Sequence, residues 1–120
     1  MMELTDAHLH YLLAIYTIAQ EQRDVCSTSI SQYLQVSGPS VSRMLGVLMK
    51  KQLIVKKRYG KIYLTDSGFL IARDFDRKMK LLKKRIPLMQ LPLCEKKAES
   101  LAFAMAVVLF KADACAKPLA

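Results

Sequence analysis

The sequence predicts a mainly α-helical protein with one small β-hairpin, in the order helix, helix-turn-helix, hairpin, long helix and terminal helix. Three observations support this fold class. Apolar residues recur at three- and four-residue spacing through most of the 120-residue chain, as on the buried faces of helices. Val36-Ser37-Gly38-Pro39 has the composition of a tight turn, and a β-branched segment over residues 53–64 is interrupted by a Tyr-Gly pair. The length suits one domain with a substantial core.

The first helix is expected to begin at Thr5 or Asp6, both good N-caps, and to run to about Gln22. His8 and His10 are two residues apart, so their side chains point to different faces, and both are interpreted as ordinary surface residues. The predicted buried stripe of this helix consists of Leu9, Leu12, Leu13, Tyr16 and Ala19.

A short connection leads to a second helix, which Thr28 is expected to cap and which ends near Gln35. In the turn that follows, the Ser37 hydroxyl can accept a hydrogen bond from the first turn of a third helix. Pro39 suits that first turn because proline has no backbone N–H, and an N–H at this position would have no partner within the helix. Two short helices with a tight turn between them are therefore predicted for residues 28–51.

The third helix is predicted to have an apolar inner face and a polar outer face. The inner stripe consists of Val41, Met44, Leu45 and Leu48. The outer face has short side chains near its N-terminus and cations further along, namely Ser40, Ser42, Arg43, Gly46 and Lys50. This distribution fits a recognition helix that reads base edges in the major groove of DNA and contacts phosphates.

A β-hairpin with a basic tip is predicted directly after this helix. Leu53-Ile54-Val55 is too short and too β-branched to extend the helix, and Tyr59-Gly60 forms a turn before Ile62-Tyr63-Leu64. The tip KKRYGK has four cations. A basic hairpin after a helix-turn-helix defines a winged helix, whose tip would lie on the sugar-phosphate backbone or in the minor groove. The alternative is a solvated hairpin whose lysines protect an edge strand.

Thr65 is expected to cap a fourth helix that Pro87 ends, with the apolar stripe Phe69, Ala72, Phe75, Met79 and Leu82. A proline-bounded linker over residues 86–92 leads to a fifth helix from near Leu93 to about Cys115. Its stretch LAFAMAVVLF is apolar all round, which predicts a homodimer that would place two recognition helices about one DNA turn apart. The expected dimer interface consists of Leu101, Phe103, Met105, Val108 and Leu109.

The net charge of +9 is concentrated in the middle of the chain. Residues 1–40 have one basic and four acidic residues, residues 41–85 have 14 and three, and residues 86–120 have four and three. A polyanion is therefore the first partner to consider, because basic groups release the counterions condensed on phosphate. The alternative is a lysine-rich surface that serves solubility.

Cysteine usage and the N-terminus predict a cytoplasmic protein with reduced thiols. Cys26, Cys94 and Cys115 are odd in number and far apart, and they are expected to be buried small side chains rather than a redox switch. The longest apolar run is about half of a membrane span, so no membrane partner is expected. No catalytic or phosphate-binding motif is present, which argues against an enzyme.

Three segments resemble the diphtheria-toxin-repressor and manganese-transport-regulator family of metal-dependent repressors: HYLLAIYTI, TSISQYLQVSGPSVSRMLGVLMKKQLIV and YGKIYLTDSG. The resemblance covers roughly residues 6–85, and its most specific pieces are the V-S-x-P-S-V turn and the Y-G…L-T…G wing. It implies an N-terminal winged helix, a helical dimerisation region, and repression of metal-uptake genes with Mn²⁺ or Fe²⁺ as corepressor.

The metal ligands that the resemblance implies are mostly replaced. The corresponding positions hold His10, Leu13, Met79, Glu99, Ala102 and Phe103. His10 and Glu99 alone keep a donor, which is too few for a selective Mn²⁺ or Fe²⁺ site, so no cofactor is expected and the metal response would be lost or altered. A rearranged site would need His8, His10, Cys94 and Glu99, but His8 and His10 cannot chelate as an i, i+4 pair.

The residues and the resemblance together predict a sequence-specific regulator of transcription, a homodimeric repressor on double-stranded DNA. Residues 1–64 would form the winged DNA-binding region, and residues 65–120 the connecting helix and the dimerisation region, as one compact unit. The expected DNA-binding residues are Thr28, Ser37, Pro39, Ser40, Ser42 and Arg43 with Lys50, Lys56, Lys57, Arg58, Tyr59 and Lys61.

Two other functions fit the same fold. One is a MarR-like regulator with a small organic effector in an apolar cavity lined by Met79, Phe103 and Met105. The other is a protein-interaction scaffold whose terminal helix pairs with another chain. A scaffold would not need Arg43, Lys50 and a basic hairpin tip on one side, whereas a DNA-binding protein would.

Overall fold

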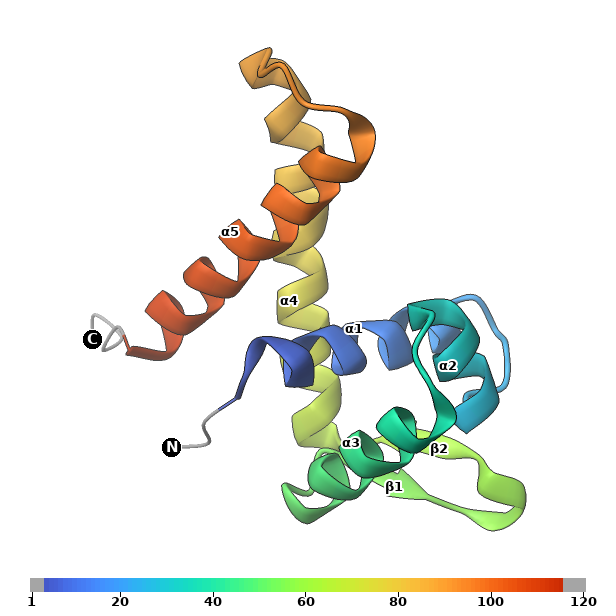
Figure 1. The fold of residues 1–120 in the computed structure, drawn as a ribbon. Coiled ribbons are helices and arrows are strands. Elements are labelled where there is room, and N and C mark those ends of the chain that lie inside the picture. Colours follow the sequence, from blue (N-terminus) through green and yellow to red (C-terminus); the bar gives the residue numbers. More distant parts are fainter. Residues whose placement is uncertain (1–3, 116–120) are drawn as a thin grey trace. The chain divides into compact units, whose positions relative to one another are not determined.

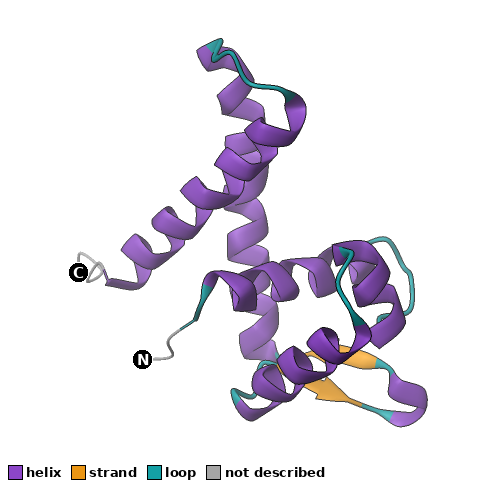
Figure 2. Cartoon of the chain, viewed as in Figure 1, coloured by secondary structure: helices purple, strands orange, loops and turns teal. Residues whose placement is uncertain are grey.

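The computed structural model describes the backbone of residues 4–115 and the side chains of residues 4–112. This part of the chain forms helices and one two-stranded hairpin, as the sequence predicts (Figures 1 and 2). The elements are α1 (Asp6–Gln20), α2 (Ser27–Leu34), α3 (Gly38–Lys50), β1 (Ile54–Lys56), β2 (Ile62–Leu64), α4 (Asp66–Arg85) and α5 (Glu95–Cys115). The short 3-10 helices η1 (Arg58–Gly60) and η2 (Ile86–Met89) lie at the hairpin tip and after α4.

The chain divides into two compact units, one ending at Arg73 and the other beginning at Asp74. The division falls inside α4, later than the boundary after residue 64 that the sequence suggests. None of the described helices combines the length and the hydropathy that a membrane span needs.

The first unit is built around α1, which contacts α2, α3 and β2. Its core includes Leu9 and Leu12, as predicted, and also Ile15 and Ile18, while Ala19 is exposed and Leu13 and Tyr16 are half-buried. The predicted stripe was therefore partly wrong. A helix that is covered on several sides buries a broader face than one three- and four-residue spacing describes.

The N-terminus of α1 is closed by a pair of reciprocal hydrogen bonds. The His8 amide donates to the Thr5 hydroxyl oxygen at 3.2 Å, and the Thr5 amide donates to His8 Nδ1 at 3.1 Å. His8 thus takes the place that glutamate usually has in a capping box. It is only 8% exposed, so its interpretation as a surface residue was wrong.

This cap makes folding stability depend on pH through His8. Burial, and then the charge of Lys51, lower the pKa of His8 from 6.5. As pH falls through 6.5, the unfolded chain binds a proton before the folded one, so stability is full above this pH and declines below it. Replacing His8 with Gln keeps a side chain that can accept the Thr5 N–H. Urea unfolding between pH 7.5 and 5 should therefore show a smaller decline in His8→Gln, by up to about 1 kcal/mol, the usual size of a helix cap. Equal declines in both proteins would contradict this role.

The N-cap of the second helix lies two residues earlier than predicted. Cys26, in an extended conformation, is the N-cap of α2, and its amide donates to the Ser29 hydroxyl at 2.9 Å. The prediction that Thr28 caps this helix was wrong, and Thr28 is instead an exposed residue of the first turn. Ser37 caps α3 as predicted, accepting from the Ser40 amide at 3.3 Å, with Pro39 in the first turn.

The hairpin pairs β1 and β2 in antiparallel register, with Val55 opposite Tyr63. The Ile62 amide donates to the Val25 carbonyl at 2.9 Å, which attaches β2 to the α1–α2 connection. After the hairpin, the Thr65 hydroxyl accepts from the Gly68 amide at 3.1 Å and donates to the Gln52 carbonyl at 2.8 Å. Thr65 thus caps α4 as predicted and also holds it against the end of α3.

The second unit contains most of α4, η2 and α5. The buried Phe75 ring lies edge-on to the rings of Phe103 and Phe110, with centroids 5.5 and 6.2 Å apart. α5 begins at Glu95, two residues later than predicted, because η2 and an irregular segment occupy the linker. One face of α5 is buried within the unit, whereas Val108 is 67% and Leu109 40% exposed.

Candidate nucleic-acid interface

The interface is built on a stretch of chain without acidic residues. Between Asp24 and Asp66 there is no Asp or Glu, and there are seven basic residues. They lie on α3, just after it, or on the hairpin: Arg43, Lys50, Lys51, Lys56, Lys57, Arg58 and Lys61. In Figure 1, α3 and the hairpin lie beside each other in the first unit, and α3 contacts β1. These elements therefore present a concentrated positive charge.

The outer face of α3 carries an ordered polar network. The Ser37 hydroxyl donates to the Ser40 hydroxyl oxygen at 2.8 Å, and Arg43 Nη2 donates to the same oxygen at 3.5 Å. Ser40 is half-buried, while Pro39, Ser42 and Arg43 are exposed. The Arg43 guanidinium thus lies near the first turns of the helix, where a recognition helix approaches base edges.

The hairpin tip has a constrained backbone and exposed side chains. Tyr59 has φ 63° and Gly60 φ 72°, so both residues are left-handed, a conformation that few residues other than glycine adopt. The Lys57 amide donates to the Lys61 carbonyl at 2.7 Å and closes the turn. Tyr59 is 93% exposed, and the Lys57 ammonium lies 5.4 Å from the centroid of the Tyr63 ring.

The basic side chains differ in their partners. Lys61 Nζ lies 3.8 Å from Asp24 Oδ1. Lys50, Lys56 and Arg58 are exposed, and no described carboxylate pairs with them.

Sequence reasoning missed one exposed residue of the outer face. Val47 lies one turn after Arg43 and is 38% exposed. Its four-residue spacing from Arg43 was the available signal. Gly46, which was assigned to this face, has no atom within 4 Å of an added Cβ, so the face is open here. On a recognition helix, an apolar side chain such as that of Val47 can contact a thymine methyl group.

The positions of the family's metal ligands hold side chains with other roles. Met79 and Ala102 are buried in the second unit, and the Phe103 ring packs against Phe75. Glu99 forms an ion pair with Lys83 at 3.2 Å, and His10 is exposed on α1. Among residues 4–112, no group of three or more His, Cys, Asp or Glu side chains could hold a metal ion. This donor set does not fit Mn²⁺ or Fe²⁺.

The cysteines are not uniformly buried. Cys26 is half-buried, and hydrogen bonding from the Ser29 amide lowers the pKa of its thiol. Cys94 is exposed, so the expectation that it is a buried small side chain was wrong, because the irregular segment before α5 leaves it uncovered. The side chain of Cys115 lies outside the described residues.

A basic helix after a tight turn, followed by a basic two-stranded hairpin, defines the first unit as a winged-helix DNA-binding domain. The chain belongs to the iron dependent repressor family, because the family's N-terminal DNA binding domain matches residues 3–62. This family consists of transcriptional regulators, which agrees with the expectation that the protein is not an enzyme.

Solved structures share the fold. The manganese regulator SloR has a TM-score of 0.71 at 23% identity, and the metal-dependent transcriptional regulator MtsR has 0.72 at 23%. Each alignment covers 86% of this chain and 47% of the other, so the chain spans about half the length of these regulators. The DNA complex of Staphylococcus aureus MepR has a TM-score of 0.59 at 24% identity, covering 90% of this chain and 79% of MepR. No curated protein matches the chain.

Proposed function

We propose that the protein is a cytoplasmic, homodimeric repressor of transcription that binds a specific sequence in double-stranded DNA through α3 and the hairpin. The observation that supports this most directly is the acid-free stretch of residues 25–65, whose seven cations all lie on or beside these two elements. A protein-interaction scaffold would not require this placement of charge.

Two sets of side chains would have different tasks on DNA. The α3 set would enter the major groove, and Arg43 would read a base, preferably guanine through two hydrogen bonds. The second set would contact phosphates, which its cations would neutralise, and would position the protein without reading sequence. The α3 set consists of Ser37, Pro39, Ser40, Ser42 and Arg43, and the phosphate set of Lys50, Lys56, Lys57, Arg58, Tyr59 and Lys61, together with Thr28 of α2.

Dimerisation through α5 would bring two such units onto one site. The exposed Val108 and Leu109, with the half-buried Leu101 and Met105, would form the contact, whereas Phe103 already packs against Phe75. Residues 1–64 would then bind DNA, and residues 65–120 would connect and dimerise. A two-fold dimer matches a pseudo-palindromic operator.

Metal control would be lost or altered in this regulator. Four of the six ligand positions hold leucine, methionine, alanine and phenylalanine, and Glu99 is paired with Lys83. Binding to the DNA upstream of the gene is therefore expected to be the same in the presence of Mn²⁺, Fe²⁺, Zn²⁺ or a chelator. A large gain in affinity with one metal would contradict the loss of metal control but would leave DNA binding itself in place.

The experiment that tests the function compares this upstream DNA with a shuffled duplex of the same composition, by fluorescence anisotropy at low salt. We expect tighter binding to the upstream fragment, with two chains in each complex by sedimentation. Equal affinity for both duplexes would overturn the proposal of a sequence-specific regulator.

Replacing Arg43 with alanine should weaken binding to the preferred operator by about 1–3 kcal/mol and relax base preference at one position in each half-site. The reason is the loss of hydrogen bonds to a base edge. Binding to a library of single-base operator variants measures the effect. Arg77→Ala is the matched control, since Arg77 is an exposed arginine of the second unit. A uniform loss over all variants would instead assign Arg43 to the phosphate backbone.

A further inference from the structure

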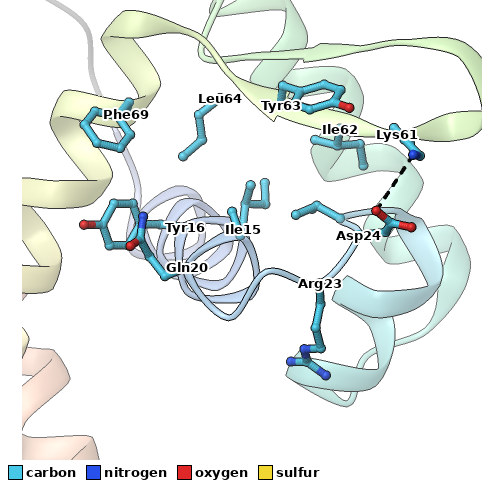
Figure 3. Close-up of a pocket in the computed structure, with 12 residues that line it drawn as sticks. Ile15, Tyr16, Gln20, Arg23, Asp24, Lys61, Ile62, Tyr63, Leu64 and Phe69 are labelled. Carbon is cyan, nitrogen blue, oxygen red and sulfur yellow. Dashed lines mark ion pairs between the residues drawn. The ribbon is translucent and has the colours of Figure 1, made fainter.

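The first unit contains a cavity of about 330 Å³ between α1, the α1–α2 connection, β2 and the start of α4. Figure 3 shows the side chains around it. Tyr16 and Phe69 lie at one end, with ring centroids 5.7 Å apart, and the Asp24–Lys61 ion pair lies at the other. Ile15 and Leu64 line the space between these ends.

The composition of this cavity is that of a site for a small organic molecule. Its lining is mostly aliphatic and aromatic, its few charged groups are gathered at one end, and its volume falls in the range of such sites. The aromatic end is not closed over, since Phe69 is exposed and Tyr16 is half-buried. A planar apolar group could therefore lie against these rings without displacing the core.

The charges around the cavity favour an anion. Lys61 and Asp24 are 3.8 Å apart and their side chains are 46% and 81% exposed, so their pairing contributes little and can be exchanged. At the aromatic end, the Arg73 guanidinium lies 5.6 Å from the Phe69 ring centroid. The Arg23 side chain points away from the cavity in Figure 3 and pairs with Glu21 at 2.9 Å. Arg23 would have to turn toward the cavity and leave Glu21, so we assign the carboxylate to Lys61.

We propose that this cavity binds a small aryl carboxylate, with its ring against Tyr16 and Phe69 and its carboxylate on Lys61. The ligand would replace Asp24 as the partner of the Lys61 ammonium. The site differs from the one that the sequence suggested at Met79, Phe103 and Met105, since Met79 is buried and Phe103 packs within the second unit.

The same contact would couple the cavity to DNA binding, a consequence that rests on the proposed function. Lys61 directly precedes β2 and is one of the proposed phosphate contacts, and the Ile62 amide attaches this strand to Val25 at the cavity wall. A carboxylate on Lys61 removes one cation from the hairpin in each protomer. Ligand and DNA would therefore weaken each other's binding by the same factor, which we expect to be about fivefold or more.

Direct binding is measured first, on the whole chain without DNA. Three probes share one planar body and differ in charge: cinnamate, cinnamylamine and cinnamyl alcohol. In ¹H–¹⁵N NMR titrations, cinnamate should saturate a single site, with the largest shifts at Ala19, Val25 and Ile62, and should bind at least about tenfold tighter than the other two. Tighter binding of cinnamylamine, equal binding of all three probes, or shifts outside the cavity would overturn the proposal.

Two variants and a control separate the contribution of the apolar part of the cavity from that of the Lys61 ammonium. Ala19→Phe fills the cavity from an exposed helix position and should abolish binding, while Lys61→Gln should weaken it about tenfold. Lys56→Gln removes a neighbouring hairpin cation that does not line the cavity, so it should leave cinnamate affinity unchanged while it weakens DNA binding. Unchanged cinnamate binding in both Ala19→Phe and Lys61→Gln would overturn the assignment.

The coupling is then read from DNA anisotropy at increasing cinnamate, at constant ionic strength. A fivefold loss of DNA affinity in the wild type, and none in Ala19→Phe, is the expected result. Saturable cinnamate binding without any effect on DNA would overturn the coupling alone. Absence of specific DNA binding would overturn the proposed function but would leave the direct titration as a valid test of the cavity.

Discussion

Replacing Gly68 with alanine is expected to destabilise the first unit by about 3 kcal/mol, because a buried backbone contact leaves no room for a methyl group. A Cβ added at Gly68 would lie far inside the van der Waals radius of the Leu53 carbonyl oxygen and 3.0 Å from its carbonyl carbon. That carbonyl also accepts a hydrogen bond from the amide of Thr65, the N-cap of α4, at 3.0 Å, so Leu53 cannot withdraw from Gly68 without breaking this bond. The loss is a large share of the 5–15 kcal/mol that typically stabilises a domain.

Urea unfolding followed by far-UV circular dichroism measures this loss. Gly46→Ala is the matched control, since Gly46 lies inside α3 with open space around its Cα. Alanine there should stabilise the protein by about 0.5–1 kcal/mol through helix propensity. A Gly68→Ala protein within 0.5 kcal/mol of the wild type would show that α4 can move away from Leu53.

The sequence predicts the fold where local chemistry decides it. Ser37 and Pro39 determine the start of α3, and the Tyr59-Gly60 pair determines the hairpin tip, because caps and left-handed turns act within a few residues. The outer face of α3 follows from helical periodicity alone. The predictions of these features therefore agree with the structure, although they use no information about contacts between distant segments.

The remaining features depend on contacts between distant segments. His8 is buried, and Cys26 rather than Thr28 caps α2, because the packing of α1 and α2 selects one of several local options. The contact of Gly68 with Leu53 and the pairing of Lys61 with Asp24 join segments that spacing cannot relate. The cavity beside Lys61 has the same origin, so periodicity gives no signal for it.

Neutralising the hairpin tip by Lys56→Ala, Lys57→Ala and Arg58→Ala together should produce the largest loss of DNA binding. In a dimer the change removes six proposed phosphate contacts, each of which releases counterions. With ten cationic contacts in the dimer, the wild type should lose roughly 10⁵-fold in affinity between about 50 and 200 mM salt, and in the variant the slope of log K against log salt should become less negative by about five. Anisotropy titrations over this range, on operator and shuffled duplexes, measure both quantities.

A control with the same loss of charge distinguishes a contact surface from general attraction. Arg77→Ala, Lys84→Ala and Arg85→Ala together remove three exposed cations from α4 in the second unit. If the hairpin contacts phosphates directly, this variant should keep a slope close to that of the wild type, because only cations that neutralise phosphates release counterions and none of these three is a proposed phosphate contact. Equal slopes for the two triple variants would mean that net charge alone attracts DNA.

Phosphate contacts carry no sequence information, so the hairpin variant should lose affinity for the operator and the shuffled duplex alike. Arg43→Ala should instead change the ratio of the two affinities.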